Sequence, residues 1–477
     1  MHAVGRVGSV VNTGPREATR QAAPARAWVG LKMPNATQNT QAKPLNIAVI
    51  GSGIVGACCA LELLRDGHSV SMIDPGEPGG EQAASYGNGA WLSPSSVVPM
   101  STPGVLRKVP GYLLDRTSPL TIRWRFLPAL MPWLLRFIRS GATVQQVERT
   151  ARALSAILAD APERHLVLAK LIGRPELVRQ AGLIYPYPSR ADFEDEALAW
   201  HLRKTNGIDW RELSKPELAA QTPALGSRYS FGIFVPAGGN CTDPGEYVAT
   251  LSAYCLAQGA KRFKAEALSF EFATQAQQKK LVGVRSSKGL IPCDTAVIAA
   301  GIRSKLLCEA LREKVPLESE RGYHVVFEAP GFELQSPLMP GDAKMAITST
   351  RGGLRVSGQV ELASMDAAPD WRRAEILRRF AVEHFPSLKS NPLHLQPVDH
   401  PSIVPPGLKR WMGHRPSTPD GLPVLSVSSV SEHIFHAFGH GHVGLASGPI
   451  SGRAIADLIA QRGSALDLAP FSVQRFA

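Results

Sequence analysis

The sequence predicts a fold that combines α/β and α+β architecture, with a discontinuous nucleotide-binding domain on a parallel sheet and a second domain on a mostly antiparallel sheet. Three observations predict it. Residues 45–74 read as a strand, a glycine-rich turn, a helix and a second strand that ends in an acid. Residues 294–307 read as a buried strand and a helix, which suits a strand returning to the first sheet. Alternating runs such as 318–327 indicate antiparallel strands.

The first stretch contains the pattern G-x-G-x-x-G at 51–56. Gly51 permits the tight turn, Gly53 lets a pyrophosphate approach the main chain, and Gly56 lets the helix pack on the strand, while the N–H groups that open the helix favour phosphates. Asp74 follows 18 residues after Gly56, where an acid can bond a ribose hydroxyl. The alternative is an ordinary βαβ unit. We predict that a dinucleotide contacts Asp74 and the run Ile50, Gly51, Ser52, Gly53, Ile54, Val55 and Gly56.

The next stretch, 75–94, is rich in turn-forming residues and reads as a loop. Because it follows the acid, we expect it to run along the cofactor toward its reactive end, with Ser85 and Asn88 as contacts. The alternative is a plain surface turn.

The later elements follow from local signals. Residues 143–222 show mostly helical spacing, and Asp243 is placed to cap a helix that opens at Pro244. Strands are predicted at 229–235, 261–272, 282–286, 295–298, 318–327 and twice within 345–360, and helices at 371–384 and after the glycine loop at 439–444.

Composition bounds the function. The chain has 477 residues, 44% of them hydrophobic, and a net charge of +12. Six basic residues against one acid give +5 within residues 1–44 alone, and no basic and aromatic pattern suits the reading of bases, so we predict no nucleic-acid partner. The six cysteines form no C-x-x-C and no cluster with histidine at metal-ligand spacing. We predict no metal site and a reducing, cytoplasmic location, with peripheral attachment at the inner face of the cell membrane as the alternative.

The first 44 residues are rich in arginine and poor in acids, which loosely resembles a transit peptide. The interpretation we favour is an over-called start, with Met33 as the true first residue, and either way we expect disorder. We predict a tail at 1–44, a nucleotide-binding domain from 45–100, 241–315 and 411–477, and a second domain from 101–240 and 316–410.

Residues 119–140 are apolar and basic together. The run carries too many charges, and is too interrupted by Pro128 and Pro132, to cross a membrane. It suits a membrane surface, with arginines toward lipid phosphates and tryptophans at the interface. The alternative is a helix pair packed on the second domain.

Six motifs in order carry a resemblance: G-S-G-I-V-G at 51–56, S-Y-G-N-G-A-W-L-S-P at 85–94, A-A-G at 299–301, E-R-G-Y-H at 320–324, G-H-R-P-S-T-P-D-G-L-P at 413–423 and G-H-G-H-V-G-L at 439–445. Over residues 45–460 the chain resembles the FAD-dependent D-amino acid oxidase and dehydrogenase superfamily, and most of all the bacterial D-amino acid dehydrogenases.

The resemblance implies a Rossmann-type FAD-binding domain and a second domain that covers the reactive face of the flavin. It implies that the substrate α-hydrogen leaves as hydride to flavin N5, that the imine hydrolyses to a 2-oxo acid and ammonia, and that electrons pass to a quinone or another respiratory acceptor. The alternatives are an oxidase of glycine, sarcosine or hydroxyproline type, and the flavin subunit of a heteromeric dehydrogenase.

The resemblance also implies site residues. Arg415 falls where relatives place the arginine that grips the substrate carboxylate, a task that suits a bidentate guanidinium. Tyr323 and His324 are candidates for a second substrate contact, although adjacent strand residues point to opposite faces. His440 and His442 lie in a glycine loop near the expected flavin ring, where main-chain N–H groups stabilise charge. The implied cofactor contacts beyond the first turn are Gly301, Gly439, Gly441 and Gly444.

Covalent relatives attach the flavin through a cysteine shortly before T-P-D, or through a histidine in the loop after the first βαβ unit. In this sequence the residues before T-P-D read W-M-G-H-R-P-S and include no cysteine. No histidine occurs between His68 and His165. We therefore predict non-covalent FAD.

Overall fold

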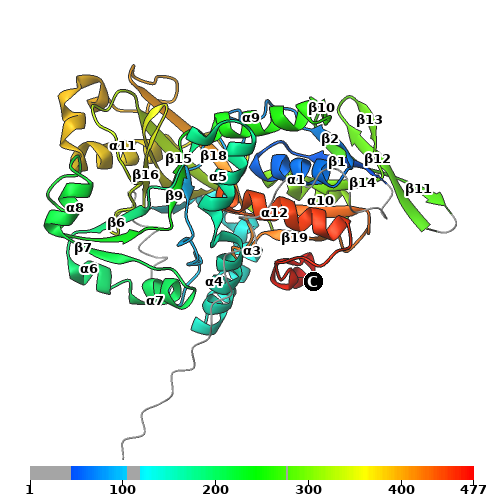
Figure 1. Cartoon of the computed structure of the whole chain (residues 1–477), viewed down its shortest axis with the longest axis horizontal. Coiled ribbons are helices and arrows are strands. Elements are labelled where there is room, and N and C mark those ends of the chain that lie inside the picture. The colour runs from blue at the N-terminus through cyan, green and yellow to red at the C-terminus, as the bar shows by residue number, and fades with distance from the viewer. Residues whose placement is uncertain (1–43, 105–118, 276–277) are drawn as a thin grey trace, which may run out of the picture. The chain divides into compact units, whose positions relative to one another are not determined.

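The computed structural model describes residues 44–104, 119–275 and 278–477. Its first sheet consists of six strands: β1 (Asn46–Ile50), β2 (Ser69–Ile73), β10 (Lys261–Phe263), β14 (Thr295–Ile298), β19 (Val424–Val427) and β20 (Ile434–Phe438). Their order is β10-β2-β1-β14-β20-β19, and only β19 runs antiparallel to its neighbour (Figure 1). The pairing of β14 with β1 confirms that the chain returns to the first sheet.

Both faces of this sheet are covered. On one face, Ile47 and Val49 of β1 share a core with the helices α1 (Ile54–Arg65), α9 (Pro244–Ala257) and α12 (Gly444–Ile459). On the other, Ala48 and Ile50 share a core with α10 (Ser304–Ala310) and with a three-stranded sheet of β11 (Ala267–Gln275), β12 (Gln278–Ser286) and β13 (Gly289–Pro292). Alternate residues of β1 thus enter opposite cores, as strand geometry requires.

The second large sheet is antiparallel at its centre, as predicted. Its order is β16 (Ala346–Thr350), β17 (Gly353–Leu362), β15 (Glu318–Phe327) and β18 (Leu408–Ser417), and β4 (Leu120–Ile122) pairs with β17. Helix α11 (Arg372–His384) packs on one face, where Leu377 and Ala381 join the core of Val325 and Phe327. In Figure 1 this sheet lies with α11 at the opposite end from α1 and β1.

Two small sheets and a set of helices complete the described residues. The sheets are β3 (Trp91–Leu92), β9 (Gly239–Cys241) and β5 (Val178–Arg179), and β6 (Leu183–Tyr187), β8 (Phe231–Val235) and β7 (Arg211–Ser214). The helices are α4 (Val144–Leu158), α5 (Ala161–Leu171), α6 (Arg190–Glu194), α7 (Ala197–Thr205) and α8 (Lys215–Gln221). The Asp243 side chain caps α9 by accepting a hydrogen bond from the Glu246 N–H, as expected.

One predicted boundary moves. The C-terminal part of the nucleotide-binding domain was expected to begin at residue 411, but residues 408–417 pair with β15 along its whole length. The structure therefore places this stretch in the second sheet, and the first sheet resumes at β19. The predicted tail at 1–44, apart from Pro44, lies outside the described residues.

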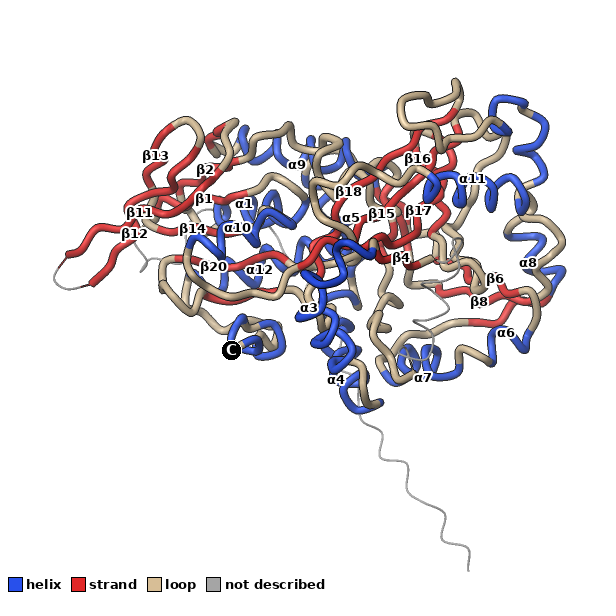
Figure 2. The backbone as a smooth tube through the Cα atoms, turned by 180° about the vertical axis from the view of Figure 1, so that it is seen from behind, coloured by secondary structure: helices blue, strands red, loops and turns tan. Residues whose placement is uncertain are grey.

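The apolar and basic run at 119–140 forms β4, a 3₁₀ turn (Trp124–Phe126) and α3 (Leu127–Ser140). Figure 2, which shows the molecule from behind, labels β4 and α3. The helix continues through Pro132 rather than stopping there. The N–H group that Pro132 lacks would have bonded residue 128, in the first turn, so one missing bond is all the helix loses. Among the helices that the structure describes, none combines the length and the apolar character needed to cross a membrane.

Candidate active site

The glycine turn fits closely between β1 and β14. Gly51 has a φ of +105°, and its N–H donates to the Ile73 carbonyl at 2.8 Å. A Cβ on Gly51 would lie 2.3 Å from the Ala299 carbonyl oxygen, and one on Gly56 would lie 1.9 Å from the Gly51 oxygen. These distances exclude any side chain at the two positions. The main chain therefore forms an unencumbered cradle at the N-terminus of α1, which suits a phosphate group.

Asp74 is oriented by the same turn. Its carboxylate accepts the Ser52 N–H at 2.7 Å and the Gly76 N–H at 2.8 Å, and the side chain stays partly exposed. The Ser52 hydroxyl is buried without a hydrogen-bond partner among the described residues. Ser85 reaches the turn from the following loop, where its hydroxyl accepts the Ile54 N–H at 3.1 Å. An unsatisfied hydroxyl beside a glycine cradle and a positioned carboxylate fits the pyrophosphate and ribose of a dinucleotide.

The other predicted cofactor contacts meet at the same sheet edge. The strands β1, β14 and β20 are parallel neighbours, so their carboxyl ends lie together. Gly301 follows β14 with a φ of +57°, and Gly439 and Gly441 follow β20 with φ values of +83° and +51°. Gly444 then opens α12. Loops far apart in the sequence thus converge on the glycine turn.

Arg415 lies on the face of the second sheet that carries Gly322 and His324. Residues directly opposite in an antiparallel pair share a face, and β18 pairs Arg415 with Glu320 and Trp411 with His324. The Arg415 guanidinium lies against Gly322, where a Cβ would approach its Cζ to 2.4 Å. This arginine therefore depends on a glycine on the neighbouring strand.

A bulge in β17 supplies a partner for Arg415. The pairing of β15 with β17 shifts between Arg321 and Tyr323, and Gln359 at this point has a φ of +58°. Its carbonyl accepts a hydrogen bond from Arg415 Nη1 at 3.1 Å. A strained non-glycine residue beside a candidate binding arginine is typical of a built site.

His442 belongs to the same neighbourhood. Surrounding protein lowers the pKa of His442 to about 4, and the charge of Arg415 contributes to that shift. Burial likewise lowers the pKa of Arg415, while the nearby charge of Glu320 opposes the change. Part of each residue nevertheless remains accessible, with His442 exposed and Arg415 half-buried. Two enclosed but partly accessible residues, one cationic and one neutral, are suited to a carboxylate ligand.

His440 has a different environment from His442. Its side chain is buried, its Nε2 hydrogen bonds the Ser451 hydroxyl at 2.9 Å, and burial lowers its pKa to about 3. The charge of Arg415 thus affects the pKa of His442, whereas burial alone lowers the pKa of His440. The loop between them is tied to β18 by the Gly441 N–H, which donates to the Pro416 carbonyl at 2.8 Å.

Tyr323 lies on the face opposite to Arg415. Its hydroxyl donates to the Glu361 carboxylate and accepts the Asp370 N–H at 3.0 Å, and its ring meets Trp371 edge-on. Burial, with the hydrogen bond to Glu361, raises its pKa. Alternation along β15 turns this side chain toward α11, away from the sheet face that carries Arg415.

His324 shares the face of Arg415 but is covered. Its ring stacks on Trp411 at a centroid distance of 5.2 Å, and its Nδ1 hydrogen bonds the Gly87 carbonyl at 3.2 Å. Only 2% of the residue is exposed. His324 is thus held between Trp411 and the loop that follows Asp74.

Two residues near this face were missed by sequence reasoning. Gln359 forms the bulge, and Arg355 donates to the carbonyls of Tyr86 and Asn88. The signal for Arg355 was available, since an arginine within a strand whose neighbours are all apolar or small is unusual. The bulge at Gln359 left no mark that pattern reasoning could find.

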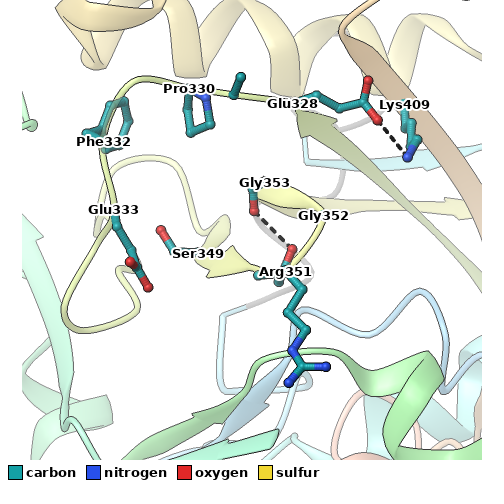
Figure 3. Close-up of a pocket in the computed structure, with 11 residues that line it drawn as sticks. Glu328, Pro330, Phe332, Glu333, Ser349, Arg351, Gly352, Gly353 and Lys409 are labelled. Carbon is teal, nitrogen blue, oxygen red and sulfur yellow. Dashed lines mark hydrogen bonds and ion pairs between the residues drawn. The ribbon is translucent and has the colours of Figure 1, made fainter. Parts of the chain in front are cut away.

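A separate pocket lies away from Arg415. Its volume is about 540 Å³, and it is lined by the turn of the β16–β17 hairpin and by residues 328–333 (Figure 3). Its charges are paired: Lys409 binds Glu328 at 2.6 Å, and Arg351 binds Glu246 and, at 3.2 Å, Glu176. We therefore do not place the carboxylate ligand there.

A buried cluster of Cys308, Glu313 and His436 has ligand atoms within 4.8 Å of one another. Its carboxylate is already satisfied, because Glu313 accepts from the Ser428 hydroxyl, the Ser429 N–H and, at 2.7 Å, from His436 Nε2. We interpret this cluster as a hydrogen-bonded part of the core.

Comparison with known proteins adds four findings. A family model described as FAD dependent oxidoreductase matches residues 46–458. The chain is 48% identical over 431 residues to a Bradyrhizobium diazoefficiens protein named D-amino-acid oxidase, covering 90% of this chain and 99% of that one. It is 32% identical over 450 residues to D-amino acid dehydrogenase 2 of Ralstonia nicotianae, covering 90% and 100%. Glycine oxidase from Geobacillus kaustophilus has a similar fold, with a TM-score of 0.64 at 21% identity over 91% of this chain and 99% of that one.

Proposed function

Because the chain belongs to the family of FAD-dependent oxidoreductases, we propose that it oxidises D-amino acids to imines, which hydrolyse to 2-oxo acids and ammonia. The single observation that carries this proposal is the position of Arg415. It lies on the sheet face that adjoins the glycine loop at 439–444, beside the accessible His442. The names of the Bradyrhizobium diazoefficiens and Ralstonia nicotianae relatives support the substrate class.

The chain contributes binding and orientation. FAD, when bound, supplies the hydride acceptor. Arg415 offers a planar pair of donors to the substrate carboxylate, and holding the substrate in one orientation is most of what such a reaction requires. The charge of Arg415 also disfavours a second positive charge nearby, so the substrate amine is biased toward its neutral form. Water takes the amine proton.

We place the cofactor contacts at the glycine turn 50–56, at Asp74, Ser85 and Asn88, and at the glycines of the β14 and β20 loops. We also propose that FAD is held without a covalent bond. The six cysteines are buried, so their thiols do not face the glycine turn from an accessible position. Acid precipitation should release all the flavin into the supernatant; flavin retained in the pellet would contradict this.

The electron acceptor distinguishes an oxidase from a dehydrogenase. The relatives carry both names, and we propose a quinone-type acceptor. The test compares, with one D-amino acid, the rate of a quinone analogue's reduction without oxygen and the rate of hydrogen peroxide formation in air. Hydrogen peroxide formed as fast as the quinone analogue is reduced would show that the protein acts as an oxidase. Turnover that requires an added partner protein would favour a heteromeric dehydrogenase.

We further propose that α3 rests on a membrane surface. Three large apolar side chains of this segment are exposed: Trp124 by 63%, Met131 by 38% and Leu135 by 56%. Its other face is fixed to the protein, since Trp133 is buried and its Nε1 donates to the Ser417 carbonyl at 3.2 Å. The helix contains no acidic residue, and the exposed basic residues of the segment are Arg125, Arg136 and Arg139. Apolar and cationic groups on one face suit an anionic lipid surface.

Co-sedimentation with vesicles tests this contact. Phosphatidylcholine vesicles with added phosphatidylglycerol should pellet the protein, and pure phosphatidylcholine should pellet less. The double variant Trp124→Ser, Leu135→Ser should lose binding, while the matched variant Leu290→Ser, Val430→Ser, at exposed apolar positions elsewhere, should keep it. Equal binding by both variants would remove the α3 assignment.

The reaction itself is tested by anaerobic titration. The purified protein should be yellow, and D-amino acids should bleach its flavin absorbance band while the L-enantiomers leave it unchanged. Bleaching by glycine, sarcosine or hydroxyproline alone would favour the alternative substrate class. A flavin band that no amino acid bleaches would contradict the proposed activity and leave the cofactor assignment intact.

A further inference from the structure

The loop at 85–90 is attached to the second sheet by four successive carbonyl groups. Arg355 Nη1 donates to the carbonyls of Tyr86 at 3.0 Å and Asn88 at 2.8 Å. His324 Nδ1 bonds the carbonyl of residue 87 at 3.2 Å, and the Thr348 hydroxyl donates to that of residue 89 at 2.9 Å. Three neighbouring strands of the sheet thus fix one short stretch of main chain.

Arg355 is the charged member of this group. Only 7% of the residue is exposed, and its hydrogen bonds within the described part of the chain go to main-chain carbonyls rather than to a carboxylate. A buried guanidinium is costly unless it is well hydrogen bonded. Here the loop carbonyls satisfy Nη1, while Nε is buried without a partner among the described residues. Burial lowers the pKa of Arg355, and the charge of Asp243 opposes this change. Because burying its charge costs free energy, we expect the Arg355 side chain to have a specific role.

The same loop reaches the glycine turn at its other end. Ser85 accepts the Ile54 N–H, and a Cβ on Gly53 would lie 3.3 Å from the Ser85 hydroxyl. The N–H groups of Gly87 and Gly89 have no acceptor within the described part of the chain. With its carbonyls bound to the sheet, the loop therefore has free donors remaining for another partner.

Gly87 shows how tightly the loop is held. A Cβ on this residue would lie 1.9 Å from the Trp411 ring. Trp411 in turn stacks on His324 and donates from Nε1 to the Glu81 carbonyl at 2.8 Å. The loop therefore has little room to adopt another path, and its position depends on the sheet beneath it.

We propose that Arg355 is a positioning residue for FAD: by binding the Tyr86 and Asn88 carbonyls it fixes the loop at 85–90, so that Ser85 and the free N–H groups are arranged for the cofactor. This inference rests on the proposed cofactor site and is independent of the substrate. Arg355 acts through the loop, because both hydrogen bonds from its Nη1 run to loop carbonyls.

Two variants and a matched control test the role of Arg355. Arg355→Met removes both hydrogen bonds while keeping a long side chain, and Arg355→Lys restores one donor group. The control is Arg351→Met on the same hairpin, where the arginine is 41% exposed and binds Glu176 and Glu246 at the surface. The dissociation constant of added FAD is measured by flavin fluorescence on protein stripped of cofactor, together with the melting temperature of the stripped protein.

The methionine variant should raise the FAD dissociation constant about 10- to 100-fold, because two hydrogen bonds to a charged group are lost. The lysine variant should recover part of the affinity, and Arg351→Met should change it less than about twofold. A methionine variant that binds FAD like the parent protein would overturn the proposal. The proposal would also be overturned if Arg355→Lys lost as much FAD affinity as Arg355→Met and if the loss of affinity simply followed the fall in melting temperature. If Arg355→Met does not fold, the FAD dissociation constants of Arg355→Lys and Arg351→Met are compared instead. A larger constant for Arg355→Lys than for Arg351→Met would support the proposal, and equal constants would overturn it.

This experiment is separate from the test of activity. A protein that binds FAD but oxidises no D-amino acid would still report the effect of Arg355 on the dissociation constant. Conversely, a protein that bleaches with D-amino acids but whose methionine variant keeps its FAD affinity would refute only the positioning role.

Discussion

The two large sheets provide different kinds of binding group. The first sheet presents main-chain groups at the carboxyl ends of β1, β14 and β20, where glycines leave the backbone uncovered. The second sheet presents side chains from β15, β17 and β18, with Arg415 as the central cation. One region is built by leaving side chains out, and the other by placing them on one face.

This difference determines how each region tolerates change. At the glycine turn an added atom meets a carbonyl oxygen that cannot move away, as at Gly56. On the second sheet a changed side chain meets other side chains or an accessible space, and the strand pairing survives. Substitutions at Gly51 and Gly56, where a Cβ would meet main-chain atoms, should therefore affect folding and cofactor together, while those in the second region should separate binding from stability.

The largest effect is expected from Gly56→Ala. Its Cβ would lie 1.9 Å from the Gly51 oxygen, so the turn must open, at a cost of about 3 kcal/mol. We expect a lower melting temperature and protein purified without flavin absorbance. The control is Gly53→Ala, whose φ of −69° accepts alanine and whose Cβ would meet only the Ser85 hydroxyl at 3.3 Å.

The control separates cofactor approach from folding. Gly53→Ala should keep the melting temperature of the cofactor-free protein but weaken FAD retention, since the new methyl group occupies the approach of the pyrophosphate. If Gly53→Ala binds FAD normally, the phosphate does not contact this turn. If Gly56→Ala stays yellow and stable, the turn is not constrained as its distances indicate.

A smaller effect is expected at Arg415, in the second region. Arg415→Lys keeps the charge but loses the planar pair of donors, which at about 1.5–3 kcal/mol raises KM for a D-amino acid roughly 10- to 100-fold. FAD should remain bound, as judged by the visible spectrum. The matched variant is Tyr323→Phe on the opposite face, which should leave KM within about twofold.

Tyr323→Phe should instead reduce stability. It removes a donor from the buried Glu361 carboxylate, at a cost of about 1–3 kcal/mol that urea unfolding can measure. Equal increases in KM for Arg415→Lys and Tyr323→Phe would refute the assignment of the two side chains to opposite faces.

The sequence predicts the first region better than the second for a physical reason. The turn at 51–56, its helix and Asp74 lie within one short stretch, and glycine spacing reports main-chain geometry directly. The face of the second sheet depends on the register between β15, β17 and β18, which are separated by tens of residues. Strand alternation correctly put Tyr323 and His324 on opposite faces, but the bulge at Gln359 and the covering of His324 by Trp411 arise only from pairing.

The same reason explains which histidine of the glycine loop faces Arg415. Both His440 and His442 precede Gly444 in one loop, and local pattern does not distinguish them. The hydrogen bond of His440 to Ser451 depends on where α12 begins and on the tie of Gly441 to Pro416. Long-range contacts, and not composition, assign the two imidazoles to different surroundings.

The smallest effect concerns pH, at the loop where the two regions meet. Burial lowers the pKa of His440 to about 3, so the unfolded chain takes up a proton near pH 6.5 while the folded protein does not. The contribution of neutral His440 to the free energy of unfolding is therefore complete above pH 6.5 and is lost as the pH falls toward 3. His440→Gln removes this titration. Between pH 6 and 5, the free energy of unfolding of the parent protein should fall about 1 kcal/mol more than that of the variant, as measured by urea unfolding. Parallel pH profiles for the two proteins would show that this imidazole is not held neutral in the fold.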